Sequence, residues 1–135
     1  DSPVPVAAGE WQNTCFESLD LMHIGKHAIA QPDLGRVGGL TEALRVCDLA
    51  AERGRRIIPH SWKTGISIAA SAHLAAVTPH CPYFEFLPAE LTDSLLRQEL
   101  VKDEIGLVDG KLSIPRKPGL GIEVDMDALR RFEQD

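Results

Sequence analysis

Four short apolar runs are spaced along the chain, and each is flanked by Gly, Pro or polar residues. Three of the four are near-continuous rather than alternating, which is typical of parallel strands covered on both faces. The sequence therefore predicts four buried strands, at Val4–Gly9, Ala28–Gln31, Arg56–Pro59 and Tyr83–Leu87.

Helical patterns fill the stretches between these runs. Apolar residues from Leu40 to Ala51 recur at i, i+3 and i+4, and Gly54 follows where a C-terminal cap belongs. Further helices are predicted at Phe16–His23, at Leu91–Leu100 and at Gly65–Val77, which is apolar nearly all round and so reads as buried. The alternation of strand and helix predicts an α/β fold with a parallel sheet and helical crossovers.

Polar or ionisable side chains mark the ends of the four runs. Glu10, Asp33 and His60 follow the first three, and Glu85 lies within the fourth, so they recur once in each strand–helix unit. In a βα barrel the carboxyl ends of the strands face the active site. We therefore predict that these four side chains meet at one mouth, formed by half of an eight-stranded barrel.

The chain changes character after Leu100, so we predict a division there. Residues 1–100 would form the half-barrel and residues 101–135 a separate tail. Within the tail, Asp109–Gly110 predicts the turn of a small hairpin, and Asp127–Phe132 predicts a final short helix. A Pro- and Gly-rich segment between the two is expected to be irregular.

Composition and charge narrow the class of protein. With 44% hydrophobic and 25% charged residues, the chain is typical of a globular domain. Its net charge of -6 and lack of a basic run argue against nucleic acid or an anionic membrane as a partner. Three widely spaced cysteines indicate neither a disulfide framework nor a thiolate zinc site, and reduced thiols favour a cytoplasmic protein. Because the sequence starts without Met or a signal peptide, we expect a fragment or a processed product.

The four polar residues together suit one kind of chemistry. A His beside a carboxylate is a competent general base, and Glu10 offers the hard oxygen ligand that Mg²⁺ prefers. A protonated Glu85 in its partly apolar run would donate a hydrogen bond to an enolate oxygen. This set favours removal of a proton α to a carboxylate. Each residue also has a structural reading: Asp33 as a turn or helix cap, His60 as a structural histidine, and the two glutamates as ion-pair partners.

Six segments resemble motifs of the enolase superfamily, in the order and spacing of its mandelate racemase group. The resemblance runs from Val4 to Asp125. It rests on Val6–Glu10 (the Gly-Glu end of strand five), Gln31–Gly39 (PDxxxxGG), Pro59–Ser61 (the catalytic His segment), Tyr83–Glu85 (the catalytic Glu segment), Asp109–Pro115 (DGxxxxP) and Pro118–Gly121 (PGLG).

The resemblance implies a modified TIM barrel of which this chain is the C-terminal half, with a tail that returns to the capping domain. It implies Glu10 as one of three Mg²⁺ ligands, Asp33 and His60 as the base dyad, and Glu85 as the hydrogen-bond donor to the enolate. The other two ligands and a second base would lie in the missing N-terminal half. The chain alone is therefore not expected to bind Mg²⁺ tightly or to turn over.

Three functions stay open at this point. The first is an acid-sugar dehydratase, and the second is a racemase or epimerase of a 2-hydroxy acid, each acting on a small carboxylate substrate. The third is a non-catalytic half-barrel that needs a partner chain. Lys63, Trp62 and Arg36 follow the predicted site residues and are minor candidates for substrate binding. A homo-oligomer is expected.

Overall fold

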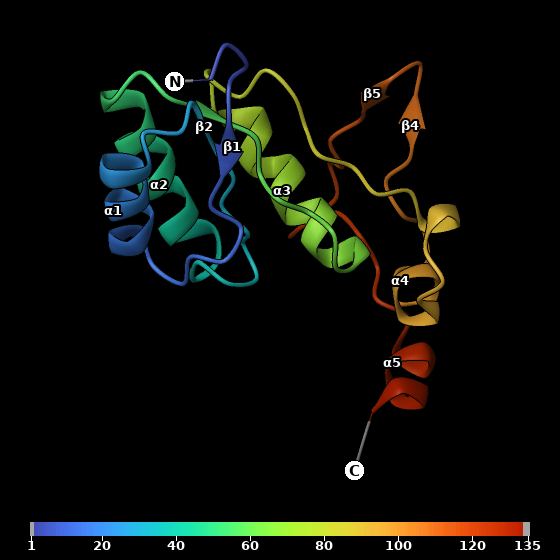
Figure 1. The fold of residues 1–135 in the computed structure, drawn as a ribbon. Helices are drawn as coiled ribbons and strands as arrows, with labels where there is room; N and C mark the ends of the chain where they lie inside the picture. Colours follow the sequence, from blue (N-terminus) through green and yellow to red (C-terminus); the bar gives the residue numbers. More distant parts are fainter. Residues whose placement is uncertain (1, 134–135) are drawn as a thin grey trace. The chain divides into compact units, whose positions relative to one another are not determined.

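The computed structural model describes residues 2–133, which divide into two compact units. Residues 2–60 and 74–85 form the first unit, and residues 61–73 and 86–133 form the second. The elements in chain order (Figure 1) are β1 (Ala7–Ala8), α1 (Cys15–Gly25), β2 (Ile29–Ala30), α2 (Gly39–Glu52), β3 (Arg56–Ile57), α3 (Gly65–Val77), the 3-10 helix η1 (Ala89–Leu91), α4 (Leu95–Glu99), β4 (Leu107–Val108), β5 (Lys111–Leu112) and α5 (Met126–Phe132).

The first unit is built on a parallel sheet. Among the described residues this sheet has three strands in the order β1-β2-β3, with Ala8 opposite Ala30 and Ala30 opposite Ile57. Helices α1 and α2 are the crossovers between successive strands, and they pack against each other. The parallel α/β arrangement is therefore confirmed, and the first three predicted strands are present but shorter than predicted, with two residues each.

Both crossover helices follow local sequence signals. Helix α1 begins at the N-cap Thr14, whose hydroxyl accepts from the Glu17 N–H, and the Glu17 carboxylate accepts from the Asn13 N–H. Helix α2 buries one face of small apolar residues and ends before Gly54, which adopts a positive φ of 62°. The residues on that buried face are Ala43, Val46, Cys47 and Ala50. Helix α3 has the predicted bounds.

The fourth predicted strand, at Tyr83–Leu87, is wrong, because these residues are irregular. The backbone bond to β3 is made before the apolar run begins, where the Ile57 N–H donates to the His80 carbonyl at 3.1 Å. Pro82 and Pro88 bracket the run, and neither has an N–H to donate to a ladder. The predicted helix at Leu91–Leu100 is also shorter than expected: η1 precedes it, and α4 starts only after the Ser94 cap.

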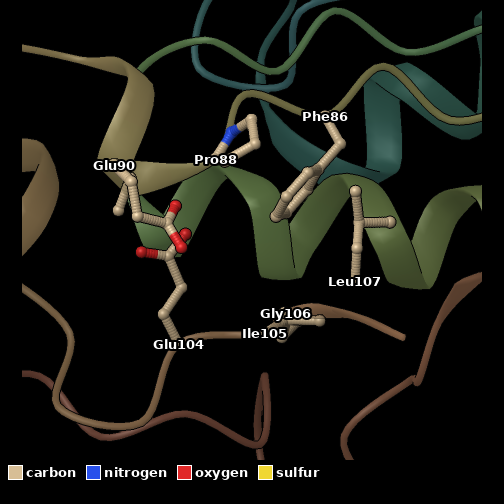
Figure 2. Close-up of a pocket in the computed structure, with 8 residues that line it drawn as sticks. Phe86, Pro88, Glu90, Glu104, Ile105, Gly106 and Leu107 are labelled. Carbon is tan, nitrogen blue, oxygen red and sulfur yellow. The ribbon is translucent and has the colours of Figure 1, made fainter. Parts of the chain in front are cut away.

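The second unit contains the predicted hairpin. Strands β4 and β5 pair antiparallel, and Asp109 and Gly110 between them adopt positive φ angles of 50° and 71°. Helix α5 matches the predicted final helix, with the Asp125 carboxylate accepting from the N–H groups of Asp127 and Ala128. A cavity of about 270 Å³ lies within this unit (Figure 2), lined by Phe86, Pro88, Ala89, Glu90, Glu104, Ile105, Gly106 and Leu107.

One arginine of the second unit, Arg97, is buried and forms polar contacts. Arg97 is 2% exposed, and its guanidinium pairs with Glu104 and donates to the Leu87 carbonyl at 2.6 Å. An arginine is tolerated at such depth only when it is paired and hydrogen-bonded. The contacts therefore tie α4 to the segments on either side of it.

The PGLG segment supplies a matched pair of glycines for a stability test. Gly121 has a φ of 72°, and a Cβ there would overlap Pro115 Cβ and lie 3.2 Å from its carbonyl carbon. Gly119 has a φ of 68°, but a Cβ there would meet open space. We expect G119A to cost only the backbone strain, about 1 kcal/mol, and G121A about 2–4 kcal/mol because overpacking is added. Urea unfolding of the two variants measures the difference, and equal losses would contradict it.

The three cysteines are free, as the sequence predicts. Burial is the main cause that raises the pKa of Cys47 and that of Cys81, the latter to about 11. Both thiols are therefore protonated and poor nucleophiles near neutral pH. Among the described residues, no helix is long and apolar enough to cross a lipid bilayer.

Candidate active site

The register of β2 and β3 continues past the strands and brings two side chains together. Asp33 and His60 form a parallel bridge, and the His60 N–H donates to the Pro32 carbonyl at 3.1 Å. Prolines 32 and 59 precede the two residues and are buried, which fixes the backbone at each strand end. The carboxyl ends of the two strands therefore present Asp33 and His60 side by side.

Both carboxylate oxygens of Asp33 and its backbone carbonyl accept hydrogen bonds from neighbouring groups. It is 0% exposed, and its Oδ2 accepts from His60 Nδ1–H at 2.9 Å. Its Oδ1 accepts from the Gly35 N–H at 2.8 Å, and its carbonyl accepts from the N–H groups of Arg36 and Val37. The same carboxylate therefore holds the turn at Gly35 and orients the His60 ring.

Glu10 lies on the opposite side of the imidazole. Its Oε2 is 3.3 Å from His60 Nε2, and its side chain is 44% exposed. Each ring nitrogen of His60 thus faces a carboxylate, and the hydrogen bond to Asp33 fixes the orientation of the ring. The half-exposed Glu10 keeps oxygen lone pairs available to a ligand.

Three more predicted residues are described by their compact unit and their exposure. Glu85 belongs to the same compact unit, and its Oε2 is shielded from solvent. Trp62 and Lys63 follow His60 in the chain but belong to the second unit, where both are exposed. Their roles stay predictions.

Sequence reasoning missed one contact near the site. The guanidinium of Arg36 lies over the ring of Trp11, with 4.0 Å between the guanidinium carbon and the ring centroid. From the sequence, Arg36 is only a minor candidate for substrate binding, and Trp11 is not singled out. Their positions in the sequence could have suggested the contact. Trp11 comes one residue after Glu10 and Arg36 three residues after Asp33, so both lie on loops that follow neighbouring strands.

Comparison with known proteins identifies the family. The model of the enolase C-terminal domain-like family matches residues 1–128. The chain belongs to this family. Solved enzymes of the mandelate racemase/muconate lactonizing enzyme type share the fold. The structure of one from Jannaschia sp. CCS1 is similar with a TM-score of 0.85 and 28% identity, and the match covers 99% of this chain and 33% of that one. Membership of the enolase superfamily, inferred from the motifs, is therefore confirmed.

Two curated relatives are similar over almost the whole chain. A D-galactarolactone cycloisomerase from Agrobacterium fabrum is 37% identical over 96% of this chain and 36% of its own length. A D-galactonate dehydratase from Xanthomonas oryzae pv. oryzae is 31% identical over 98% of this chain and 35% of its own length. The chain thus spans little more than a third of the length of these curated relatives.

A Mg²⁺ site of the enolase-superfamily kind would be shared between this chain and residues outside it. Glu10 fits the ion, because it is a half-exposed hard oxygen donor at the carboxyl end of β1. In residues 2–133 no group of three or more His, Cys, Asp or Glu side chains could hold a metal. Asp33 is already engaged through both oxygens. The chemistry of Glu10 therefore fits the predicted ligand, and its role stays a prediction.

Proposed function

We propose that this chain is the C-terminal portion of a Mg²⁺-dependent enzyme that removes the proton α to the carboxylate of an acid sugar and dehydrates it through an enolate. The observation that carries the proposal is the pairing of His60 with buried Asp33 at 2.9 Å, beside the carboxylate of Glu10. A dehydratase among the curated relatives supports the reaction type. The substrate, a small hydroxylated carboxylate, is proposed from the same comparison.

His60 would act as the base. Because Asp33 can only accept, it holds the proton on Nδ1 and leaves Nε2 as the atom that takes the α-proton. The imidazolium that results is stabilised by the same Asp33 carboxylate. His60 then carries the proton that a departing β-hydroxyl needs to leave as water.

The enolate would be stabilised from two directions. Glu85, in its protonated form, would donate a hydrogen bond to an enolate oxygen. Mg²⁺ held by Glu10 and by ligands outside this chain would neutralise the charge that develops on the substrate carboxylate. This chain thus supplies the base, its orienting partner, one metal ligand and one donor.

An isomerase is the second candidate, and the comparisons favour it specifically. The 37% identical relative is a cycloisomerase. A solved 3,6-anhydro-D-galactonate cycloisomerase from Zobellia galactanivorans is 34% identical, with a TM-score of 0.88, and the match covers 99% of this chain and 37% of that one. The same α-proton removal gives dehydration when the β-oxygen leaves as water, and isomerisation when that oxygen stays tethered through a ring. A racemase or epimerase would need a second base outside this chain.

The test is a product analysis of the full-length enzyme with Mg²⁺. Aldonic acids, aldaric acids, their lactones and anhydro forms, and 2-hydroxy acids are incubated in D₂O and followed by NMR. A 2-keto-3-deoxy acid formed with loss of water supports the dehydratase, the same acid from a lactone or anhydro ring supports the isomerase, and an inverted, deuterated α-carbon supports the racemase. Absence of α-proton loss from every class would refute the enzyme proposal and leave the non-catalytic half-barrel.

Four further expectations belong to the whole protein. We propose that residues 101–135 form a tail that packs against the N-terminal portion, and that residues 1–100 complete a barrel with it. A homo-oligomer and a cytoplasmic location also stay predictions. Size-exclusion chromatography with light scattering of the full-length protein measures its oligomeric state.

A further inference from the structure

We infer that Arg36 and Trp11 act as a pair of positioning residues that fixes the loop carrying Glu10 to the turn that follows Asp33. The inference rests on the proposed function, because it concerns the same site. Its basis is the stacking of the Arg36 guanidinium over the Trp11 ring at 4.0 Å. Both residues would act through their neighbours in the chain.

Arg36 stands on the turn that Asp33 organises. The Asp33 carbonyl accepts from the Arg36 N–H at 3.0 Å and from the Val37 N–H at 2.8 Å, while its carboxylate accepts from Gly35. The other carboxylate oxygen of Asp33 is bound to His60. The backbone of Arg36 is therefore fixed relative to the imidazole.

Trp11 follows Glu10 directly on the loop between β1 and α1. Its side chain is 64% exposed, so burial does little to hold it, and the Glu10 side chain is itself 44% exposed. The loop leaves the sheet at Gly9, where φ is 124° and a Cβ would lie 3.3 Å from the Gln31 backbone nitrogen. The contact of Trp11 with Arg36 would therefore set the direction in which this loop carries Glu10.

The stack connects the two loops at the site. The connection runs from His60 to Asp33, through the turn to Arg36, across to Trp11, and along the chain to Glu10. An arginine over a tryptophan face is the favourable form of cation–π contact, and its planar group keeps its N–H edges hydrated. The two loops at the site are thereby locked to each other.

The experiment is a double-mutant cycle in the full-length enzyme. R36Q and W11L remove one partner each, R36Q/W11L removes both, and R36K and W11F keep a cation and a ring. R45Q is the matched control, since Arg45 is an exposed arginine on α2 that pairs with Glu42 instead. For each variant, kcat, KM and the affinity for Mg²⁺ alone by calorimetry are measured.

We expect R36Q and W11L each to lower kcat and Mg²⁺ affinity by roughly fivefold to tenfold, with KM little changed. This loss lies between the effect of removing an exposed cation–π contact and the effect of misplacing a group at the site. The double variant should be no worse than either single one, and R36K and W11F should recover most of the loss. Losses that multiply, or an R36Q defect confined to KM, would overturn the inference in favour of independent packing or substrate contact.

A spectroscopic readout separates this inference from the proposed function. The protein is labelled with 5-fluorotryptophan, and the Trp11 signal is assigned by its loss in W11F. R36Q should shift this signal, R36K should shift it less, and the Trp62 signal should not move. An unchanged Trp11 signal overturns the stack whatever the enzyme does. A shifted signal and weakened Mg²⁺ binding, in a protein that acts on no acid sugar, would refute the function and leave the positioning pair.

Discussion

The variant H60N should lower kcat of the full-length enzyme by about 10⁴-fold, the upper end of what a general acid–base residue contributes. Asn cannot take up a proton at neutral pH, so both the removal of the α-proton and its delivery to the leaving group would be lost. The Asn amide can still donate to Asp33, which is 0% exposed and would otherwise be left as a buried carboxylate without its partner at this oxygen. The fold is therefore expected to survive the change.

The measurements are steady-state turnover and the exchange of the substrate α-proton with solvent D₂O. H23N is the control, because His23 is an exposed histidine near the end of α1. It should leave both rates unchanged. An H60N enzyme that still exchanges the α-proton at the normal rate would show that another group is the base.

The parts of the site that could be predicted depend on register. Parallel strands that are one crossover apart keep their carboxyl ends level, so residues that follow each run in the sequence arrive at the same edge. This is why Asp33 and His60 are hydrogen-bonded and why Glu10 reaches the second ring nitrogen. The helices α1, α2 and α3 could be predicted because helix caps and hydrophobic periodicity depend only on residues that are close in the sequence.

The parts that could not be predicted depend on tertiary partners. The apolar run at Tyr83–Leu87 is not a strand in this structure, because pairing needs a neighbouring backbone that no local pattern encodes. Arg97 reads as a surface residue, yet it is buried by a partner seven residues away and a carbonyl ten residues away. The stacking of Arg36 on Trp11 likewise depends on how two loops meet.

The variant D33N should lower kcat by about 10²- to 10⁴-fold, which is the range for a dyad whose histidine is held in the wrong tautomer. Asp33 uses both oxygens as acceptors, one from His60 Nδ1 and one from the Gly35 N–H. Asn has one acceptor oxygen. If that oxygen stays with Gly35, the amide N–H faces Nδ1 and makes it an acceptor, so the ring proton moves to Nε2.

With the proton on Nε2, the imidazole has no lone pair to offer the α-proton, although every side chain keeps its place. Kinetics and ¹⁵N NMR of the His60 ring together test this account: D33N should lose activity while its ring nitrogens report protonation at Nε2 rather than Nδ1. D48N is the matched control, since Asp48 lies on α2 away from the imidazole. Loss of activity with the ring proton still on Nδ1 would mean that Asp33 acts through its charge alone, and full activity would remove Asp33 from the dyad.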